Sequence, residues 1–137
     1  MNRVHANELP QFLRRFRMTG GAIRRVSLRH TSDKSSSVEF RLTVREPVAK
    51  LGDKPKKIRL TLRLDGVEEY RFQMRPGQPK ARVADARIGY LNGLFYVSLD
   101  ALGLEPNEAA QVFDFRTAEV FAAGRELSWN EGEPRQL

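Results

Sequence analysis

Few side chains in this sequence are suited to acid–base or nucleophilic chemistry. There are two histidines and no cysteine, which excludes thiolate nucleophiles, thiolate metal sites and disulfides. His5 lies in an N-terminal segment that we expect to be mobile. His30 precedes Thr31 and Ser32, where an imidazole and a hydroxyl can pair, but the nearest carboxylate, Asp33, is in the same polar turn. Because neighbouring positions rarely form a triad, we assign no catalytic residue.

Three carboxylates cluster in the region between two strand-like segments: Asp100, Glu105 and Glu108. They define a weak candidate for the carboxylate site of a small hydrolase. The segment 105–108, Glu-Pro-Asn-Glu, is also typical of a helix start or an exposed loop. The sequence contains no His-x-His pair, no carboxylate-rich calcium loop and no phosphate-binding glycine loop. We therefore assign no metal ligand and no cofactor.

The strongest chemical signal is positive charge. The chain of 137 residues has 24 Lys and Arg against 17 Asp and Glu, a net charge of +7. Residues 1–80 hold 19 basic and 8 acidic side chains, a net +11, whereas residues 81–137 hold 5 and 9, a net −4. Such an imbalance indicates an acidic partner, either a protein or a nucleic acid, or else a solvated sheet face that binds nothing.

The basic residues of the first half alternate with apolar ones along two stretches, 37–45 and 57–74. Alternation at a period of two puts apolar side chains on one face of a strand and charged ones on the other. The candidate partner-binding residues on the charged face are Arg41, Arg45, Lys57, Arg59, Arg63 and Arg71. The aromatic residues Phe40, Tyr70 and Phe72 fall on the apolar rows, which argues against stacking of nucleic-acid bases on this face. Charge pairing with Glu39 and Glu69 would explain the face without a ligand.

Two hairpins are predicted from paired alternating segments. The first covers residues 57–74 and turns at Asp65-Gly66, and the second turns at Asn92-Gly93. Turns between the strand-like segments recur about every eight to twelve residues. The sequence therefore predicts a mainly β fold, an antiparallel β-sandwich or curled sheet of six to eight strands, with one N-terminal helix.

The helix is predicted over residues 7–18, because Leu9, Phe12, Leu13 and Phe16 form one apolar stripe. Gly20-Gly21 is expected to end it. At this length the helix is expected to cover one end of the sheet. We predict one domain over residues 1–137, with a β domain over 22–129 and a flexible tail over 130–137. Within the β domain, residues 112–117 and 118–123 are short β-rich runs, of which the second is also compatible with a helix.

Three features resemble a group of small bacterial β-rich proteins of unknown function near the immunity-protein families of toxin systems. They are Gly20-Gly21-Ala22-Ile23 at the start of a strand, the alternating stretch 58–72 around Asp65-Gly66-Val67, and the closing Leu127-Ser128-Trp129. The resemblance implies a catalytically inert module that binds another protein. It transfers no particular binding residue.

We expect a cytoplasmic protein with no membrane partner. No apolar stretch approaches the roughly 20 residues that span a bilayer, and the first residues lack the pattern of a secretory signal. A homodimer joined through sheet edges is compatible with the predicted strands. The leading hypothesis is a non-enzymatic module that binds an acidic protein. The alternatives are a nucleic-acid-binding domain that uses the same arginines, and the small hydrolase.

Overall fold

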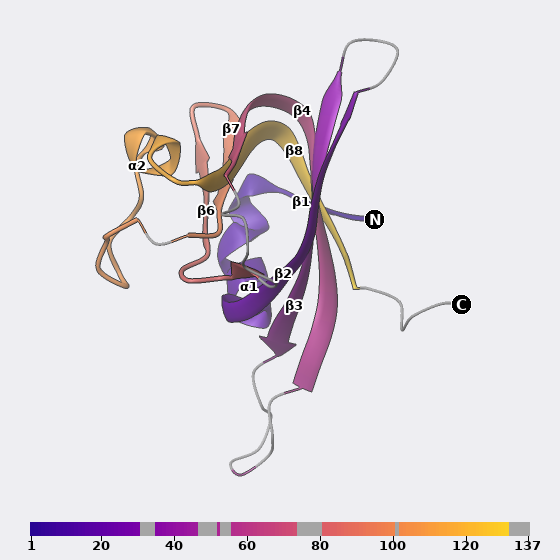
Figure 1. Cartoon of the computed structure of the whole chain (residues 1–137), viewed down its shortest axis with the longest axis vertical. Helices are drawn as coiled ribbons and strands as arrows, with labels where there is room; N and C mark the ends of the chain where they lie inside the picture. Colours follow the sequence, from indigo (N-terminus) through magenta and orange to yellow (C-terminus); the bar gives the residue numbers. More distant parts are fainter. Residues whose placement is uncertain (31–34, 47–51, 53–55, 74–80, 101, 132–137) are drawn as a thin grey trace.

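The fold is one curled antiparallel sheet with a helix packed on its concave side (Figure 1). The computed structural model describes residues 1–30, 35–46, 52, 56–73, 81–100 and 102–131. Seven strands follow the order β5-β2-β3-β4-β8-β7-β6, and an eighth, β1, pairs with β8. The strands are β1 (Asn2–Val4), β2 (Arg17–His30), β3 (Ser36–Glu46), β4 (Lys56–Phe72), β5 (Ala81–Arg82), β6 (Arg87–Leu91), β7 (Leu94–Ser98) and β8 (Val120–Glu131). The predicted mainly β fold is confirmed, as a curled sheet rather than a sandwich.

The core is built on the alternating row of β3 and the first half of β4. Phe40, Leu42, Leu62 and Leu64 have no exposed surface, and Val38 and Val44 extend the same row. Phe40 faces Leu62 and Leu42 faces Leu60 across the two strands. A slip of one residue would turn this entire row toward water, so the burial of the row sets the register of the two strands.

The predicted hairpin over residues 57–74 is wrong, because β4 continues through Asp65-Gly66 without reversing direction. Of Asp65 and Gly66, only Gly66 has a positive φ, +64°. A two-residue hairpin turn of the Asp-Gly kind needs a positive φ at both positions. The strand bends there and carries a bulge between Val67 and Glu69. Because β8 pairs with both halves of β4, the continuous strand satisfies backbone hydrogen bonds that a reversal would break.

The second hairpin is confirmed. Asn92 and Gly93 have φ of +54° and +83°, and they join β6 to β7. β7 is buried on both faces, with Phe95 and Val97 in the main core and Tyr96 in a second cluster. Before this hairpin, residues 83–86 separate β6 from the short strand β5.

The N-terminal helix is shorter than predicted and ends earlier. A 3₁₀ turn (η1, Ala6–Glu8) leads into α1 (Leu9–Arg15), and Phe16 is already extended. Gly20-Gly21 lies inside β2 instead of ending the helix. A bulge displaces the chain here. Arg17 pairs with Arg45 and Ala22 pairs with Thr43, so residues 18–21 of β2 lie opposite a single residue of β3. A Cβ on Gly21 would overlap the Thr43 carbonyl oxygen, so this close approach of β2 to β3 requires glycine.

As predicted, α1 covers one end of the sheet. Phe12 and Phe16 pack against Trp129 of β8, with ring centroids 6.0 and 5.1 Å apart. Arg15 lies over the same indole and also pairs with Glu131 at 2.8 Å. Residues 130 and 131 of the expected tail therefore belong to β8, and the rest of that tail lies outside the described residues.

Residues 112–116 form a helix, α2 (Val112–Arg116), and not the expected β run. The β-branched and aromatic composition of this segment favoured a strand. The Asp114 carboxylate instead accepts a hydrogen bond from the Gln111 amide at 2.7 Å, which closes the first helical turn. Phe115 then packs with Tyr96 and Phe121 in a second cluster that covers the outer face of the bent half of the sheet. Of the run 118–123, residues 120–123 form the start of β8.

No helix within the described part of the chain is long and apolar enough to cross a membrane.

The bend in β4 predicts a specific sensitivity to Gly66→Ala. The left-handed conformation costs a non-glycine residue about 1–2 kcal/mol, and the new Cβ would also lie 3.2 Å from the Cβ of Arg125. Gly93→Ala is the matched control, because its φ is also positive but its Cβ would meet no atom within 4 Å. Urea denaturation should show a larger loss of stability for Gly66→Ala. Equal losses would mean that the contact with Arg125 is unimportant.

Candidate binding surface

Five of the six predicted binding residues lie on one outer face of β3 and β4. Across the two strands Arg45 faces Lys57, Thr43 faces Arg59, Arg41 faces Thr61 and Glu39 faces Arg63. They point outward because they alternate with the fully buried row that forms the core. The shared placement of Arg41, Arg45, Lys57, Arg59 and Arg63 was therefore visible in the sequence.

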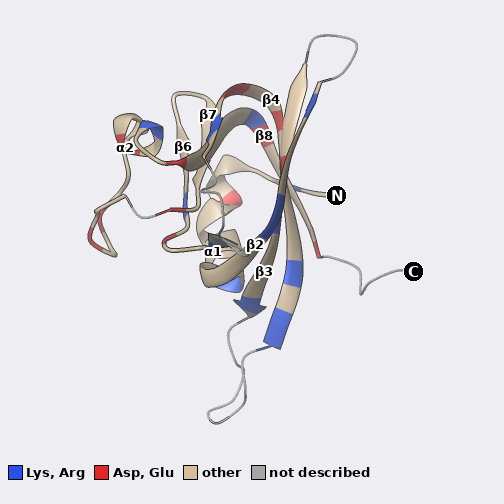
Figure 2. Cartoon of the chain, in the orientation of Figure 1, with Lys and Arg blue, Asp and Glu red and all other residues tan. Residues whose placement is uncertain are grey.

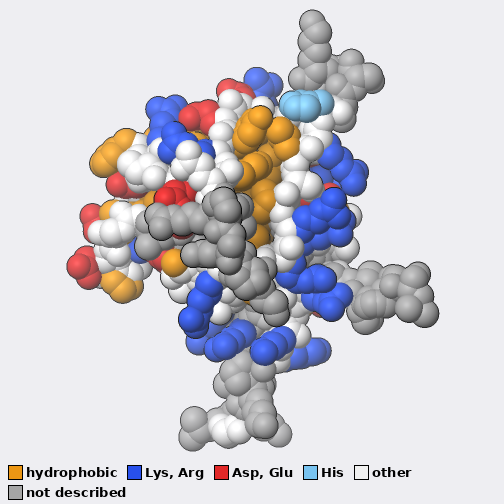
Figure 3. Space-filling model, viewed as in Figure 1, with side chains coloured by type: hydrophobic (Ala, Val, Ile, Leu, Met, Phe, Trp, Pro, Cys, Tyr) orange, Lys and Arg blue, Asp and Glu red, His pale blue; other side chains and the backbone are white. Residues whose placement is uncertain are grey.

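β2 adds three cations to this face that sequence reasoning missed. Arg17 lies opposite Arg45. Arg25 lies opposite Arg41, and Arg29 lies opposite Ser37. The alternation of Val26 and Leu28 with these arginines was a usable signal, but the bulges in β2 hid its register against β3. We call Arg17, Arg25, Arg29, Arg41, Arg45, Lys57, Arg59 and Arg63 the basic face. Figure 3 shows lysine and arginine side chains gathered along one side and the lower end of the molecule.

Like charges face each other on this surface. Arg25 lies directly opposite Arg41, and a second row runs from Arg17 through Arg45 to Lys57. Directly opposed like charges destabilise a sheet by a few tenths to about 1 kcal/mol per pair. The opposed cations on this surface therefore lower the stability of the isolated fold.

Carboxylates reduce the positive charge at the other end of the surface. Glu39 pairs with Arg41 at 3.4 Å and Asp65 pairs with Arg63 at 3.1 Å, both along a single strand. Glu126 lies 3.8 Å from Arg3 of β1. The surface is thus mixed in charge toward Asp65 and purely cationic toward Lys57 among the described side chains. The expectation that acidic residues dilute this face is confirmed for Glu39.

Arg71, the sixth predicted residue, does not extend the basic face. It lies beyond the bend at Gly66, where its guanidinium donates hydrogen bonds to the carbonyl oxygens of Arg116 at 2.8 Å and Ala118 at 3.3 Å. Its Cζ also lies 5.9 Å from the centroid of the Phe121 ring. Grouping Arg71 with the other cations assumed a hairpin. The bent strand instead brings this residue against the end of α2.

Acidic side chains concentrate on the opposite part of the molecule, over α2 and the loop that precedes it (Figure 2). One of them, Glu69 of β4, forms a two-pronged ion pair with Arg116 of α2, in which both contacts are 2.8 Å long. This hydrogen bonding lowers the pKa of the Glu69 carboxyl and raises the pKa of the Arg116 guanidinium. The pair ties α2 to the bent half of β4.

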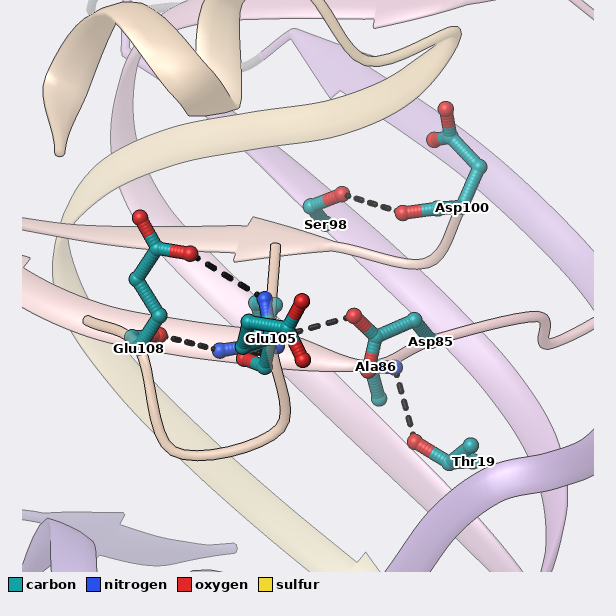
Figure 4. A network of polar contacts seen from close by, with 8 residues as sticks. Thr19, Asp85, Ala86, Ser98, Asp100, Glu105 and Glu108 are labelled. Atoms are coloured by element: carbon teal, nitrogen blue, oxygen red, sulfur yellow. Dashed lines mark hydrogen bonds and ion pairs between the residues drawn. The ribbon is translucent and has the colours of Figure 1, made fainter. Parts of the chain in front are cut away.

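The three carboxylates proposed as a hydrolase site do not converge. The Asp100 carboxylate accepts hydrogen bonds from the amides of Glu119 and Val120, both 2.9 Å long, at the start of β8. Glu108 accepts a hydrogen bond from the Glu105 amide at 3.1 Å, within its own loop. Figure 4 shows the Asp100 carboxylate directed away from the other two. Their geometry supports structural roles.

Arg87 fixes the loop that carries two of these carboxylates. Its guanidinium donates to the Asp85 carboxylate at 2.9 Å and to the carbonyl oxygens of Glu105 and Glu108 at 2.8 and 2.6 Å. Beside this loop is a groove of about 830 Å³ between the start of β2 and the edge strand β6. Phe16, Met18 and Phe115 are among its mainly apolar lining, which includes none of the three candidate carboxylates.

The histidines offer no further site in the described chain. The His30 Nδ1 lies 2.8 Å from Ser36 Oγ, its neighbour across β2 and β3, so the imidazole does meet a hydroxyl, but not the expected one. Thr31, Ser32 and Asp33 lie outside the described residues. The His5 amide donates to the Glu8 carboxylate at 2.9 Å and caps η1. Nowhere in the described ranges do three or more His, Asp or Glu side chains gather as metal ligands would.

Comparisons with known proteins provide no assignment. No family model matches this chain, and searches of curated proteins and of solved structures gave no significant match. The function must therefore be argued from the residues of the chain itself.

The ion pair between Glu69 and Arg116 predicts a pH-dependent contribution to stability. A carboxyl whose pKa is lowered on folding stabilises the fold above its unfolded pKa, and this contribution is lost as the pH falls through the folded pKa. We expect Glu69→Gln to lower the free energy of unfolding only slightly at pH 7, because Arg116 is exposed and Glu69 is half-buried, so that solvent screens the pair. In urea denaturation, the difference from wild type should shrink as the pH falls below about 4.3, the unperturbed pKa of a glutamate.

Glu68→Gln is the control, since it removes a carboxylate of the same strand that pairs with the more exposed Arg125. A constant difference between wild type and Glu69→Gln from pH 7 to pH 3 would contradict this role.

The two amide hydrogen bonds of Asp100 predict a structural effect of its removal. Asp100→Ala leaves the amides of Glu119 and Val120 without this acceptor, and hydrogen bonds to a charged group contribute about 1.5–3 kcal/mol. We expect a loss of stability in that range. Asp100→Asn, which keeps one side-chain oxygen as an acceptor, should lose less. Thermal unfolding of both variants measures the difference, and unchanged stability of Asp100→Ala would exclude the structural role.

Proposed function

We propose that this protein is a non-enzymatic interaction module whose basic face binds an acidic surface of another protein. The observation that carries the proposal is the pair of like-charge rows, Arg25 with Arg41 and Arg17 with Arg45 and Lys57. Each row brings cations together at a cost to the isolated fold, which Glu39 offsets in part beside Arg41. Carboxylates of a partner placed between them would relieve that repulsion.

The chemistry of arginine supports a protein contact of this kind. Arg25, Arg45 and Arg59 are exposed and make no ion pair with another described side chain. A guanidinium binds a carboxylate through two parallel hydrogen bonds, and its planar group is more weakly hydrated than an ammonium. Opposite charges across an interface mainly increase the rate of association and the specificity.

Two features favour a protein over a nucleic acid. The face has no exposed aromatic residue between its arginines on which a base could stack. Glu39, Asp65 and Glu126 lie at its other end and would repel a continuous phosphate backbone. A protein surface can place a cation opposite these carboxylates, so the mixed pattern suits a protein partner better. The absence of cysteine is compatible with binding in the reducing cytoplasm, where we propose that the protein acts.

The proposal predicts selective loss of binding on charge reversal of the basic face. Fluorescence anisotropy would measure the binding of a labelled twelve-residue peptide of alternating Glu and Gly, and of a single-stranded DNA of equal charge. We expect the peptide to bind more tightly than the DNA at low salt. Arg25→Glu with Arg59→Glu should weaken peptide binding at least about tenfold, since each lost charged contact is worth about 1 kcal/mol or more.

The double variant Arg14→Glu with Arg125→Glu is the matched control. It changes the net charge equally, but Arg14 lies on α1 and Arg125 lies beyond the bend of the sheet. Equal weakening by both double variants would mean that net charge alone drives binding, which overturns the proposal. Tighter binding of DNA, with a steep linear fall of log affinity against log salt, would replace it with the nucleic-acid alternative.

A further inference from the structure

A recess lies at the cationic end of the basic face. It has a volume of about 330 Å³ and is lined by parts of four strands, β2, β3, β4 and β5. This volume is at the lower end of the range of about 300–1,000 Å³ for small-molecule sites. The described residues that line it are Gly20, Gly21, Ala22, Thr43, Val44, Arg45, Lys57 and Arg82. We call it the basic recess.

Three cations from three different strands line the recess. Arg45 comes from β3, Lys57 from β4 and Arg82 from the short edge strand β5. None of the three forms an ion pair with another described side chain, and no carboxylate is among the described residues of the lining. The register explains why they meet: Arg45 faces Lys57, while Arg82 faces Ala22, which in turn faces Thr43.

The space between these cations exists because β2 contributes almost no side chain there. The bulge between Arg17 and Ala22 displaces the strand, and Gly20 and Gly21 line the recess with backbone only. Gly21 packs too closely on the Thr43 carbonyl to carry a Cβ. Thr43 is half-buried, and its hydroxyl can donate a hydrogen bond to a ligand. Strand pairing thus produces a concave site with cationic walls.

We propose that the basic recess binds the phosphate group of a small soluble phosphomonoester. A phosphomonoester carries a charge of about −1.5 to −2 at pH 7 and three acceptor oxygens. Two guanidinium groups and one ammonium supply the matching charge, and the guanidinium groups bind phosphate through paired hydrogen bonds. A carboxylate has half the charge and two oxygens, so it would leave part of this donor set unused.

The site is distinct from the contact proposed for the acidic protein. Arg25, Arg29, Arg41, Arg59 and Arg63 of the basic face do not line the recess, and Arg82 does not belong to the basic face. Arg45 and Lys57 belong to both. Substitution of Arg82 therefore tests the recess alone, and substitution of Arg25 with Arg59 tests the face alone.

The experiment is isothermal titration of the full chain with phenyl phosphate, and with benzoate as the carboxylate counterpart of the same ring. We expect saturable binding of phenyl phosphate to one site and at least about tenfold weaker binding of benzoate. Arg82→Gln should weaken phenyl phosphate binding at least about tenfold, because it removes a charged contact worth about 1.5 kcal/mol or more. Arg41→Gln, the matched control on the basic face outside the recess, should change it less than about twofold.

Arg82 is exposed on an edge strand, so its substitution should leave the fold intact, which circular dichroism would verify. Absence of saturable binding, or equal weakening by Arg82→Gln and Arg41→Gln, would overturn the inference. Binding to vesicles that contain phosphatidic acid, without binding of phenyl phosphate, would also overturn it, because the phosphate would then belong to a lipid surface. The peptide measurement with Arg25→Glu and Arg59→Glu is unaffected by any of these outcomes.

Discussion

The structure depends on the hydrogen bonding of β4 along both of its edges. The 17 residues of this strand pair with β3 over Lys56–Asp65 and with β8 over Leu60–Phe72. Unpaired backbone amides and carbonyls in a protein interior are unfavourable, so the strand cannot be interrupted without loss on both sides. The bend at Gly66 lets the strand remain continuous while the sheet changes direction. The curled shape in Figure 1 follows from this compromise.

The same bend divides the outer face of the sheet into two environments. Before Gly66 the outer side chains face water, and cations accumulate there. After Gly66 the outer face is covered by α2, whose Phe115 packs on Tyr96 and Phe121. Arg71 and Glu69 lie on this covered half, where they contact α2 through hydrogen bonds and an ion pair. The role of a charged residue on β4 thus depends on the side of the bend where it lies. Before the bend its side chain faces water, and after the bend it contacts α2 and helps to hold the fold together.

The basic face and the basic recess are products of strand pairing. Single strands of this chain alternate charge with apolar residues in an ordinary way, and no local motif marks a ligand. Pairing then sets cations beside cations, in the row of Arg17, Arg45 and Lys57 and in the pair of Arg25 with Arg41. The wide bulge of β2 opens the space that Arg82 completes from the edge. An acidic surface and a phosphate group are two chemistries that such a concentration of positive charge can accept.

The sequence by itself determined the fold class, the buried row of β3 and β4, the Asn92-Gly93 hairpin and five of the six surface cations, because a period of two and a turn with two positive φ values are local properties. Tertiary structure decided the rest. Asp65-Gly66 looked like a turn, but pairing of β8 with both halves of β4 made it a bend. Residues 112–116 had strand-like composition, but a side-chain cap and the burial of Phe115 made them a helix. The register of β2, which brings Arg25 to the face and opens the recess, depends on bulges set by contact with β3, and such long-range contacts leave no local pattern in the chain.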